Sequence, residues 1–488
     1  MPTHDAAIAV SRFGLGARPG DVARISHDPR GYLLASLEPA RALLANTDDL
    51  RPSNEIFAEA MEAQREVRKA REMAAAAGVT PQGGAAPPTK SDRIAPAAKD
   101  APGPQAEKST KAGEPAIKPG RIRREAFRAD AAARFQRATT TDDAFIERLV
   151  MFWSNHFCVS VTKAPVRGIA GAFEREAIRP HVLGRFGDML KAVEQHPAML
   201  VYLDNQVSIG PDSRAGMNRK RGLNENLARE ILELHTLGVD GGYTQADVTE
   251  FARVLTGWTV AGLNQQREDP GRFMFAPMRH EPGERTVAGR RYSDRGVETG
   301  EAVLADMARR PETARHIAAK FARHFLGDDP PAAVVTRLET SFRSTDGDLR
   351  ALARTLIEAP ESWQATARVA LPPYDFLIAV VRGCGIRLAD GETLRLCAAL
   401  GQPLWQPPSP KGWPDGNDAW TSPAAVRERL RVSEMAARRV DATADPRALA
   451  DDLLGERLGG DTRSAVARAE TRAQGFELLV MSPEFQRR

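Results

Sequence analysis

The sequence predicts a mainly α-helical protein: a large multi-helix assembly with a small β-hairpin excursion near residues 273–292 and a disordered insertion. Long runs rich in alanine, leucine and arginine accompany an aromatic content of only 6%, which favours helices over strands. Apolar residues recur at helical spacing in several long segments. Because 42% of the 488 residues are hydrophobic, the chain can bury a sizeable core, and we expect a single mostly helical domain over residues 1–488.

One low-complexity segment interrupts the helical pattern. Before it, residues 6–37 predict short helices around a glycine-rich turn at 14–20. Residues 79–120 are rich in alanine, proline, glycine and lysine, with almost no large apolar side chains, so burial there cannot offset the entropy lost on ordering. We therefore predict a disordered insertion over 79–120. Its flanks, 54–77 and 121–139, are charged and alanine-rich, which predicts the two arms of a helical hairpin.

A run of helices follows the insertion. Asp142 is placed to cap the next helix. The apolar positions of that helix recur at helical spacing, at Phe145, Leu149, Phe152 and Trp153. From there we expect helices as far as Trp258.

The chain then changes character twice. Three short extended pieces, 273–275, 285–287 and 290–292, are separated by Pro-Gly and Ala-Gly pairs, which predicts a small β-hairpin or meander. Helices are expected to resume at 302–309, 311–326, 332–342, 348–358 and 374–384. Residues 401–420 contain too many prolines for a helix or a central strand, and their three tryptophans indicate packing onto the helical body.

The segment 224–248 carries the most specific polar pattern. It predicts an acidic helix, a glycine turn and a second helix that has Thr244 as its N-cap and Asp247 three residues later. His235 falls among the apolar positions of the first helix, and Glu230 lies at their edge. A buried polar side chain needs a hydrogen-bonding partner, so these two residues belong either to a structural network or to a site.

Two interpretations of the histidines stay open. In the first, His156, His235, His280 and Glu230 converge on a divalent transition metal, because two or three imidazoles with a carboxylate suit zinc or a non-haem metal. Spacing weighs against this interpretation, since Glu230 and His235 lie about 140° apart around a helix of 3.6 residues per turn. In the second, His156 and His235 donate ring hydrogen bonds to backbone or carboxylate partners and lock helices together.

Two further features have a chemical and a structural interpretation. The loop 411–416 is either the lip of a ligand site or a place where tryptophan and proline pack against helices. His316 and His324 share one face of a predicted helix, but eight residues separate them. That separation is too large for both to bind one ion.

Composition and motifs exclude several classes of protein. The net charge is only +4, without a dense basic stripe, so we expect no nucleic-acid partner. Cys158, Cys384 and Cys397 form no CxxC pair, which argues against a disulfide framework and favours buried thiols. The sequence contains no serine-hydrolase elbow and no P-loop.

The location of the protein is predicted from segments that the sequence lacks. No run of residues approaches the length of a transmembrane segment, and the N-terminus has no signal-peptide pattern. We therefore expect no transmembrane segment and a cytoplasmic location. Export together with a signal-bearing partner, and a different start codon that adds a leader, are the alternatives.

Five motifs together resemble the bacterial domain of unknown function 1800 family. They occupy residues 12–20, 147–157, 196–205, 224–247 and 408–416, in the family's order. The resemblance covers nearly the whole chain apart from the insertion, and it implies a lineage but no activity that can be carried over. Where the family usually has His-Asp in the extended region, this chain has His280-Glu281, so an acid is retained.

Two functions follow as alternatives. Members of the resembled family are often encoded beside a protein of the domain of unknown function 1501 family, which resembles sulfatases and alkaline phosphatases, so the resemblance implies a partner. We favour a helical scaffold or accessory protein that binds this partner and assists its folding or export. The alternative is a metal-dependent or acid/base enzyme, a hydrolase or an oxidoreductase, with its centre at His156, Glu230, His235 and His280. In that enzyme Glu230 and His235 would be the catalytic residues.

Overall fold

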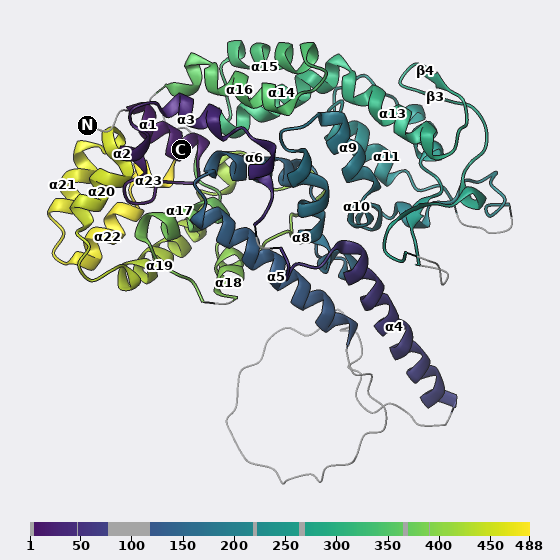
Figure 1. The fold of residues 1–488 in the computed structure, drawn as a ribbon, viewed down its shortest axis with the longest axis horizontal. Helices are drawn as coiled ribbons and strands as arrows, with labels where there is room; N and C mark the ends of the chain where they lie inside the picture. The colour runs from purple at the N-terminus through teal and green to yellow at the C-terminus, as the bar shows by residue number, and fades with distance from the viewer. Residues whose placement is uncertain are drawn as a thin grey trace, which may run out of the picture.

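The computed structural model describes residues 4–45, 47–76, 118–217, 222–262, 269–364, 369–389 and 391–488. Within these residues the protein is built almost entirely from helices, with two small antiparallel sheets of two strands each. The prediction of a mainly α-helical fold is confirmed. Figure 1 shows the helices gathered around α6 (Ala144–His156), with the N-terminal helices beside the C-terminal ones.

The N-terminal helices pack against the end of the chain. They are α1 (His4–Ile8), α2 (Asp21–Ile25) and α3 (Pro29–Ser36), and a π-helical turn, Ala9–Phe13, continues α1. Asp28 caps α3 by accepting a hydrogen bond from the backbone nitrogen of Gly31 (2.8 Å), which satisfies one of the free donors at a helix start. α2 lies against α20 (Pro446–Leu454), so the two ends of the chain share one lobe.

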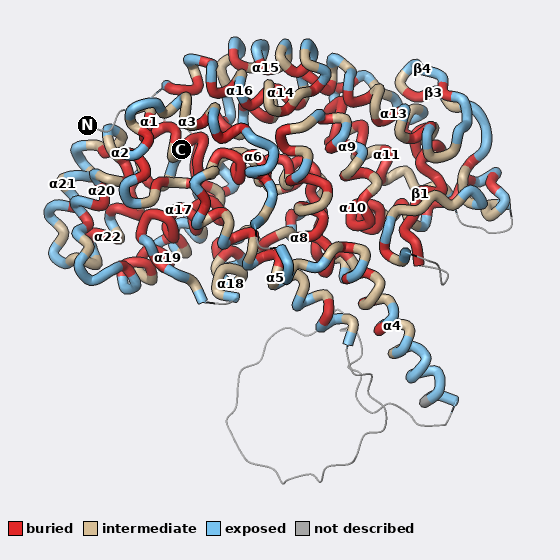
Figure 2. Tube along the Cα trace, in the orientation of Figure 1, coloured by how far each residue is buried: buried red, intermediate tan, exposed pale blue. Residues whose placement is uncertain are grey.

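The predicted helical hairpin is present. Its arms are α4 (Ser53–Ala76) and α5 (Pro119–Thr140), which contact each other and project from the body, and the far end of α4 is exposed (Figures 1 and 2). The predicted disordered insertion lies outside the described residues except for 118–120. Of these three, Pro119 and Gly120 are already helical, with proline at the first helical position where its missing N–H costs nothing.

The central helices form the core of the protein. They are α6, α7 (Ala164–Arg167), α8 (Ala170–Phe173), α9 (Phe186–Gln195), α10 (Pro197–Tyr202), α11 (Asn226–Glu230) and α12 (Gln245–Val254). π-helical turns follow α8 and α11, at Glu174–Ile178 and Ile231–His235. The apolar positions predicted for α6 are buried, and Figure 2 shows this part of the trace in the colour of buried residues. Thr244 caps α12 together with Asp247, as predicted.

The extended region forms two separate ribbons. The strands are β1 (Trp258–Val260), β2 (Phe273–Phe275), β3 (Arg285–Val287) and β4 (Arg290–Tyr292). β3 and β4 form the predicted hairpin, whose turn residues Ala288 and Gly289 both have positive φ, the geometry of a two-residue hairpin turn. β2 pairs instead with β1, so the prediction of helices as far as Trp258 is wrong. Gly257 (φ +85°) ends the helical run, because it turns the chain against the carbonyl of Ala276.

The remaining helices cover one side of the core and build the C-terminal lobe. They are α13 (Val297–Arg309), α14 (Pro311–Leu326), α15 (Ala332–Ser344), α16 (Leu349–Glu358), α17 (Pro373–Cys384), α18 (Glu392–Ala399), α19 (Pro423–Arg439), α20, α21 (Gly460–Ala467), α22 (Arg472–Val480) and α23 (Pro483–Gln486). In the described part of the chain, no helix is both long and apolar enough to cross a bilayer. All three cysteines are buried free thiols, as predicted.

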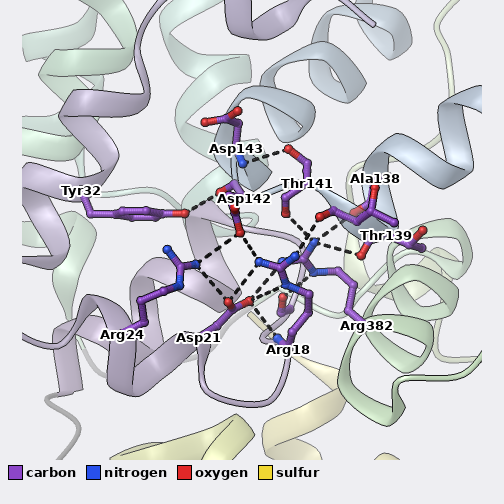
Figure 3. Close-up of polar contacts among 12 residues, drawn as sticks. Arg18, Asp21, Arg24, Tyr32, Ala138, Thr139, Thr141, Asp142, Asp143 and Arg382 are labelled. Atoms are coloured by element: carbon purple, nitrogen blue, oxygen red, sulfur yellow. Dashed lines mark hydrogen bonds and ion pairs between the residues drawn. The ribbon is translucent and has the colours of Figure 1, made fainter. Parts of the chain in front are cut away.

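A group of charges around buried Asp21 and Arg382, which we call the Asp21 cluster, joins α2, α17 and the loop between α5 and α6 (Figure 3). Its members are Arg18, Asp21, Arg24, Asp142 and Arg382. Through Nη1, Arg382 donates to three carbonyl oxygens at the end of α5, those of Ala138 (3.2 Å), Thr139 (3.4 Å) and Thr141 (3.0 Å). A helix offers no backbone donors to its last carbonyls and carries partial negative charge there, so a guanidinium group suits this place.

Asp21 completes the cluster by accepting three guanidinium groups. Arg18, Arg24 and Arg382 approach it at 3.2, 3.0 and 3.3 Å. Burial alone would raise the pKa of Asp21, but its hydrogen bonds to Arg18 and Arg24 lower it. Burial lowers the pKa of Arg382 to about 10.

The prediction that Asp142 caps α6 is wrong, because its carboxylate pairs with Arg18 and Asp143 directly precedes the helix.

Candidate functional site

The end of α6 is held by the loop that follows residue 401. Asn155 donates through Nδ2 to the carbonyl of Trp413 (3.0 Å) and accepts from the backbone nitrogen of Trp413 through Oδ1 (2.8 Å). Gly412 lies so close that a Cβ atom would sit 2.5 Å from the carbonyl oxygen of Asn155, and its φ is +90°. Only glycine fits this position. Two of the sequence motifs, 147–157 and 408–416, are therefore joined in space.

A cluster of buried side chains, the histidine cluster, lies on another side of the same helix end. His235 Nδ1 lies 2.7 Å from Glu194 Oε1, and both side chains are almost completely buried. His156 Nε2 lies 3.2 Å from the carbonyl oxygen of His235, and the two rings are 6.2 Å apart. The structure thus brings together two of the four predicted site residues, and each uses a ring nitrogen for a structural hydrogen bond.

His316 of α14 is a further member that the sequence did not assign to this cluster. Its Nε2 lies 3.2 Å from the carbonyl oxygen of Leu234, and its ring is 6.2 Å from the ring of His156. Burial lowers the pKa of His156, and burial with the nearby charge of Lys320 lowers the pKa of His316 to about 4. Both imidazoles are therefore neutral near pH 7. Sequence spacing could not identify His316, because α14 and α6 meet only in the fold.

The angle around the helix axis between Glu230 and His235 is smaller than a regular α-helix would give, because a π-helical turn separates the two residues. The π-helical turn Ile231–His235 winds more residues into each turn than an α-helix does. The separation of about 140° assumed a regular α-helix, so it does not hold over this turn. Glu230 is half-buried; burial raises its pKa, and the nearby charge of His235 opposes that rise.

His280, the fourth predicted site residue, has partners of its own. Its Nδ1 lies 2.9 Å from the carbonyl oxygen of Thr256, and its Nε2 lies 3.1 Å from Asp294 Oδ1. The neighbouring Glu281 accepts from the backbone nitrogen of Asp212 (2.8 Å). Among the described residues, no group of three or more His, Cys, Asp or Glu side chains is placed to hold a metal ion. The metal site stays a prediction.

A cavity of about 100 Å³ lies between α5, α6, α14, the start of α17 and the loop 402–415. We call it the Arg488 cavity. Its polar lining comes from Arg134, Ser154, Asn155, Cys158, His324, Tyr374, Asp375, Gln402, Asp415 and Arg488, and its apolar lining includes Met151, Leu404, Trp405 and Trp413. The structure thus places the loop 411–416 both against a helix and at the lip of a cavity, which combines its two sequence interpretations.

The charges around the Arg488 cavity are only partly paired. Arg148 donates to Asp375 Oδ2 at 2.7 Å, whereas Arg488 Nε lies 3.9 Å from the same oxygen. Burial alone would raise the pKa of Asp375, but Arg148 and Arg488 lower it. Arg134 donates to Glu174 (2.7 Å) and stacks over the ring of Tyr374 at 4.7 Å. These residues come from five distant parts of the chain, so no local sequence pattern marks them.

Lys320 interacts electrostatically with residues of both the histidine cluster and the Arg488 cavity. Burial lowers its pKa, and the charge of Asp415 opposes that effect. Its positive charge in turn lowers the pKa of both His156 and His316. The two sites therefore share an electrostatic environment.

Comparisons with known proteins give a family and no activity. Neither a curated protein nor a solved structure matches the chain. A family model described as a protein of unknown function (DUF1800) matches residues 8–487, which includes the end of α6, the histidine cluster and nearly all of the Arg488 cavity. With a match over essentially its whole length, the chain belongs to the DUF1800 family.

Proposed function

We propose that this chain is a helical accessory protein that binds a partner protein, and that the partner is a protein of the domain of unknown function 1501 family. One observation carries the proposal: three exposed apolar side chains, Val207, Met217 and Met278, come from segments that backbone and side-chain hydrogen bonds join, and we call them the apolar patch. These side chains are 44%, 70% and 49% exposed. Large exposed apolar side chains that gather in one place favour association with another surface.

The backbone beneath this patch is fixed. Gly210 N donates to the carbonyl of Arg279 (2.9 Å), and Ala215 N donates to the carbonyl of Met278 (2.8 Å). Glu281 accepts from the backbone of Asp212 in the same segment. A patch held in this way needs little ordering when a partner binds, which favours affinity. The hydrogen-bonded state of the histidine cluster also supports an accessory role, because ring nitrogens bound to backbone carbonyls serve to hold helices in place.

The proposal is tested with a protein of the domain of unknown function 1501 family from the same source as this chain. We expect a complex on size-exclusion chromatography and a dissociation constant that rises at least about 100-fold when Val207, Met217 and Met278 are all changed to serine, because each buried apolar side chain contributes about 1.5–3 kcal/mol. The matched control changes Val426 and Leu430, two exposed apolar residues of α19, to serine. Equal binding by the triple variant, or no complex with the wild type, would rule the proposal out.

A second candidate is an enzyme with its centre at His156, Glu230 and His235, with His280 in a supporting role. Glu230 favours it, because a half-buried carboxyl group with a raised pKa beside a π-helical turn is a feature of many active sites. The metal-dependent form of this candidate requires a stoichiometric transition metal in protein purified without chelator. It also requires loss of that metal in His235→Ala. Protein that contains no metal would eliminate this form.

A further inference from the structure

We propose that the Arg488 cavity binds a small organic acid and that the carboxylate of this acid is held by Arg488. The proposal is independent of partner binding. None of Val207, Met217 and Met278 lines the cavity. It rests on buried polar groups that the protein leaves without partners and on the chemistry of the cavity walls.

The first observation is the state of the Arg488 side chain. Its backbone is fixed, because Arg488 N donates to the carbonyl of Val369 (2.9 Å) and its own carbonyl accepts from Val369 N (3.2 Å). Its side chain is only 2% exposed. Among the described residues, neither Nε nor Nη1 has a hydrogen-bond partner. A buried cation without hydrogen bonds is costly, and native proteins leave few such groups without a partner or a ligand.

The second observation is the electrostatic environment of Arg488. The carboxylates of Asp375 and Asp415 attract its positive charge, whereas the guanidinium groups of Arg12 and Arg148 repel it. Asp375 already accepts the close hydrogen bond from Arg148. A carboxylate ligand matches both the charge of Arg488 and the planar arrangement of its N–H groups.

The third observation is the rest of the lining. His324 Nε2 is buried in the cavity wall without a hydrogen-bond partner in the described part of the chain, and its Nδ1 lies 3.8 Å from Asp415. Burial lowers the pKa of His324 to about 4, so the ring is neutral, and its Nε2 donates to the second oxygen of an acid in the tautomer that carries the proton on Nε2. Trp405, Trp413 and Leu404 also line the cavity and give it apolar surface suited to the body of an organic acid.

The test uses the full chain and three defined probes: acetate, benzoate and inorganic phosphate, each titrated at constant ionic strength in chloride. Trp405 and Trp413 line the cavity, so tryptophan fluorescence reports occupancy, and calorimetry gives the dissociation constant. We expect saturable binding of a carboxylate that weakens at least about tenfold in Arg488→Met, because a charge-assisted pair is lost. Arg488→Lys keeps the positive charge but loses the planar pair of N–H donors of the guanidinium group, so this variant should bind the carboxylate with intermediate affinity.

Two controls separate the site from general electrostatics and from misfolding. Lys411→Met removes an exposed charge from the same loop and should leave binding unchanged. Leu404→Trp enlarges a side chain that lines the cavity and should abolish binding while Arg488 is intact. The proposal is overturned if neither carboxylate saturates up to about 10 mM, if phosphate binds more tightly than both, or if Arg488→Met binds like the wild type.

Discussion

The Asp21 cluster and the Arg488 cavity each contain a buried arginine, Arg382 and Arg488, and the two differ in their partners. In the Asp21 cluster, Arg382 donates to four backbone carbonyls and lies 3.3 Å from a carboxylate (Figure 3). In the cavity, Arg488 lies 3.9 Å from its nearest carboxylate and, among the described residues, has two nitrogens without partners. Both side chains are almost fully buried, so solvent does not explain the difference.

This difference separates a structural arginine from one that is available to a ligand. The fold satisfies Arg382 with the last carbonyls of α5, and the result ties three distant segments together. The same protein leaves Arg488 beside a cavity. Burial of a charge is favourable only when hydrogen bonds replace those lost from water. The two clusters should therefore respond in opposite ways when their arginines are removed, and this can be measured.

The largest effect is expected for Arg382→Met. This change leaves the carbonyls of Ala138, Thr139, Thr141 and Gly16 without their donor, and each buried polar group left unpaired costs about 1–3 kcal/mol. Because some of these groups will recruit water, we expect a loss of about 3–5 kcal/mol in the free energy of unfolding. Denaturant titration followed by circular dichroism measures it. Arg387→Met, an exposed arginine after the same helix, should change stability by less than about 0.5 kcal/mol. A similar small change for Arg382→Met would show that the cluster is not structural.

A smaller and pH-dependent effect is expected for Asp21→Asn. The folded pKa of Asp21 is below its ordinary value of 3.8. Its stabilising contribution is therefore complete above that value and is lost as the pH falls through the folded pKa. We expect a loss of about 2 kcal/mol at pH 7. The gap between wild type and variant should stay constant down to about pH 5 and narrow below about pH 4.

Unfolding titrations of both proteins across this pH range test the expectation for Asp21. The matched control is Asp142→Asn, which removes an acid of the same cluster whose side chain is 66% exposed. An exposed pair contributes at most about 1 kcal/mol. A gap between wild type and Asp21→Asn that persists unchanged at pH 3 would contradict the assignment of the effect to the Asp21 carboxylate.

The sequence predicts the helices and turns that depend on residues close together in the chain. Helical spacing located α6 and the arms α4 and α5, capping chemistry located the start of α12, and the turn at Ala288 and Gly289 located the hairpin. It failed at β1, because a strand of three residues is stabilised by pairing with β2 across a distant turn. The prediction for Asp142 also failed. An aspartate can either cap a helix or pair with an arginine, and only the tertiary contacts decide which of the two it does.

The candidate sites were predicted less completely for the same reason. His156 and His235 were identified from their places on helical faces, and they do lie together. The angle between Glu230 and His235 was misjudged because a π-helical turn leaves no clear signal in the sequence. Arg488, Tyr374 and Asp375 were missed altogether, because a cavity is formed by segments that meet only in the folded chain.

The smallest effect on stability is expected for Arg488→Met, and it gives the sharpest contrast with Arg382→Met. Removing a buried cation whose Nε and Nη1 have no hydrogen-bond partner among the described residues relieves a desolvation cost, and the methionine side chain fills much of the same volume. We expect the free energy of unfolding to stay within about 1 kcal/mol of the wild type, or to rise. Saturating carboxylate should stabilise the wild type and leave the variant unchanged, since only a folded state that binds the ligand gains from it. Thermal unfolding with and without benzoate measures both quantities. If Arg488→Met lost as much stability as Arg382→Met, Arg488 would be a second structural arginine and the distinction between the two clusters would fail.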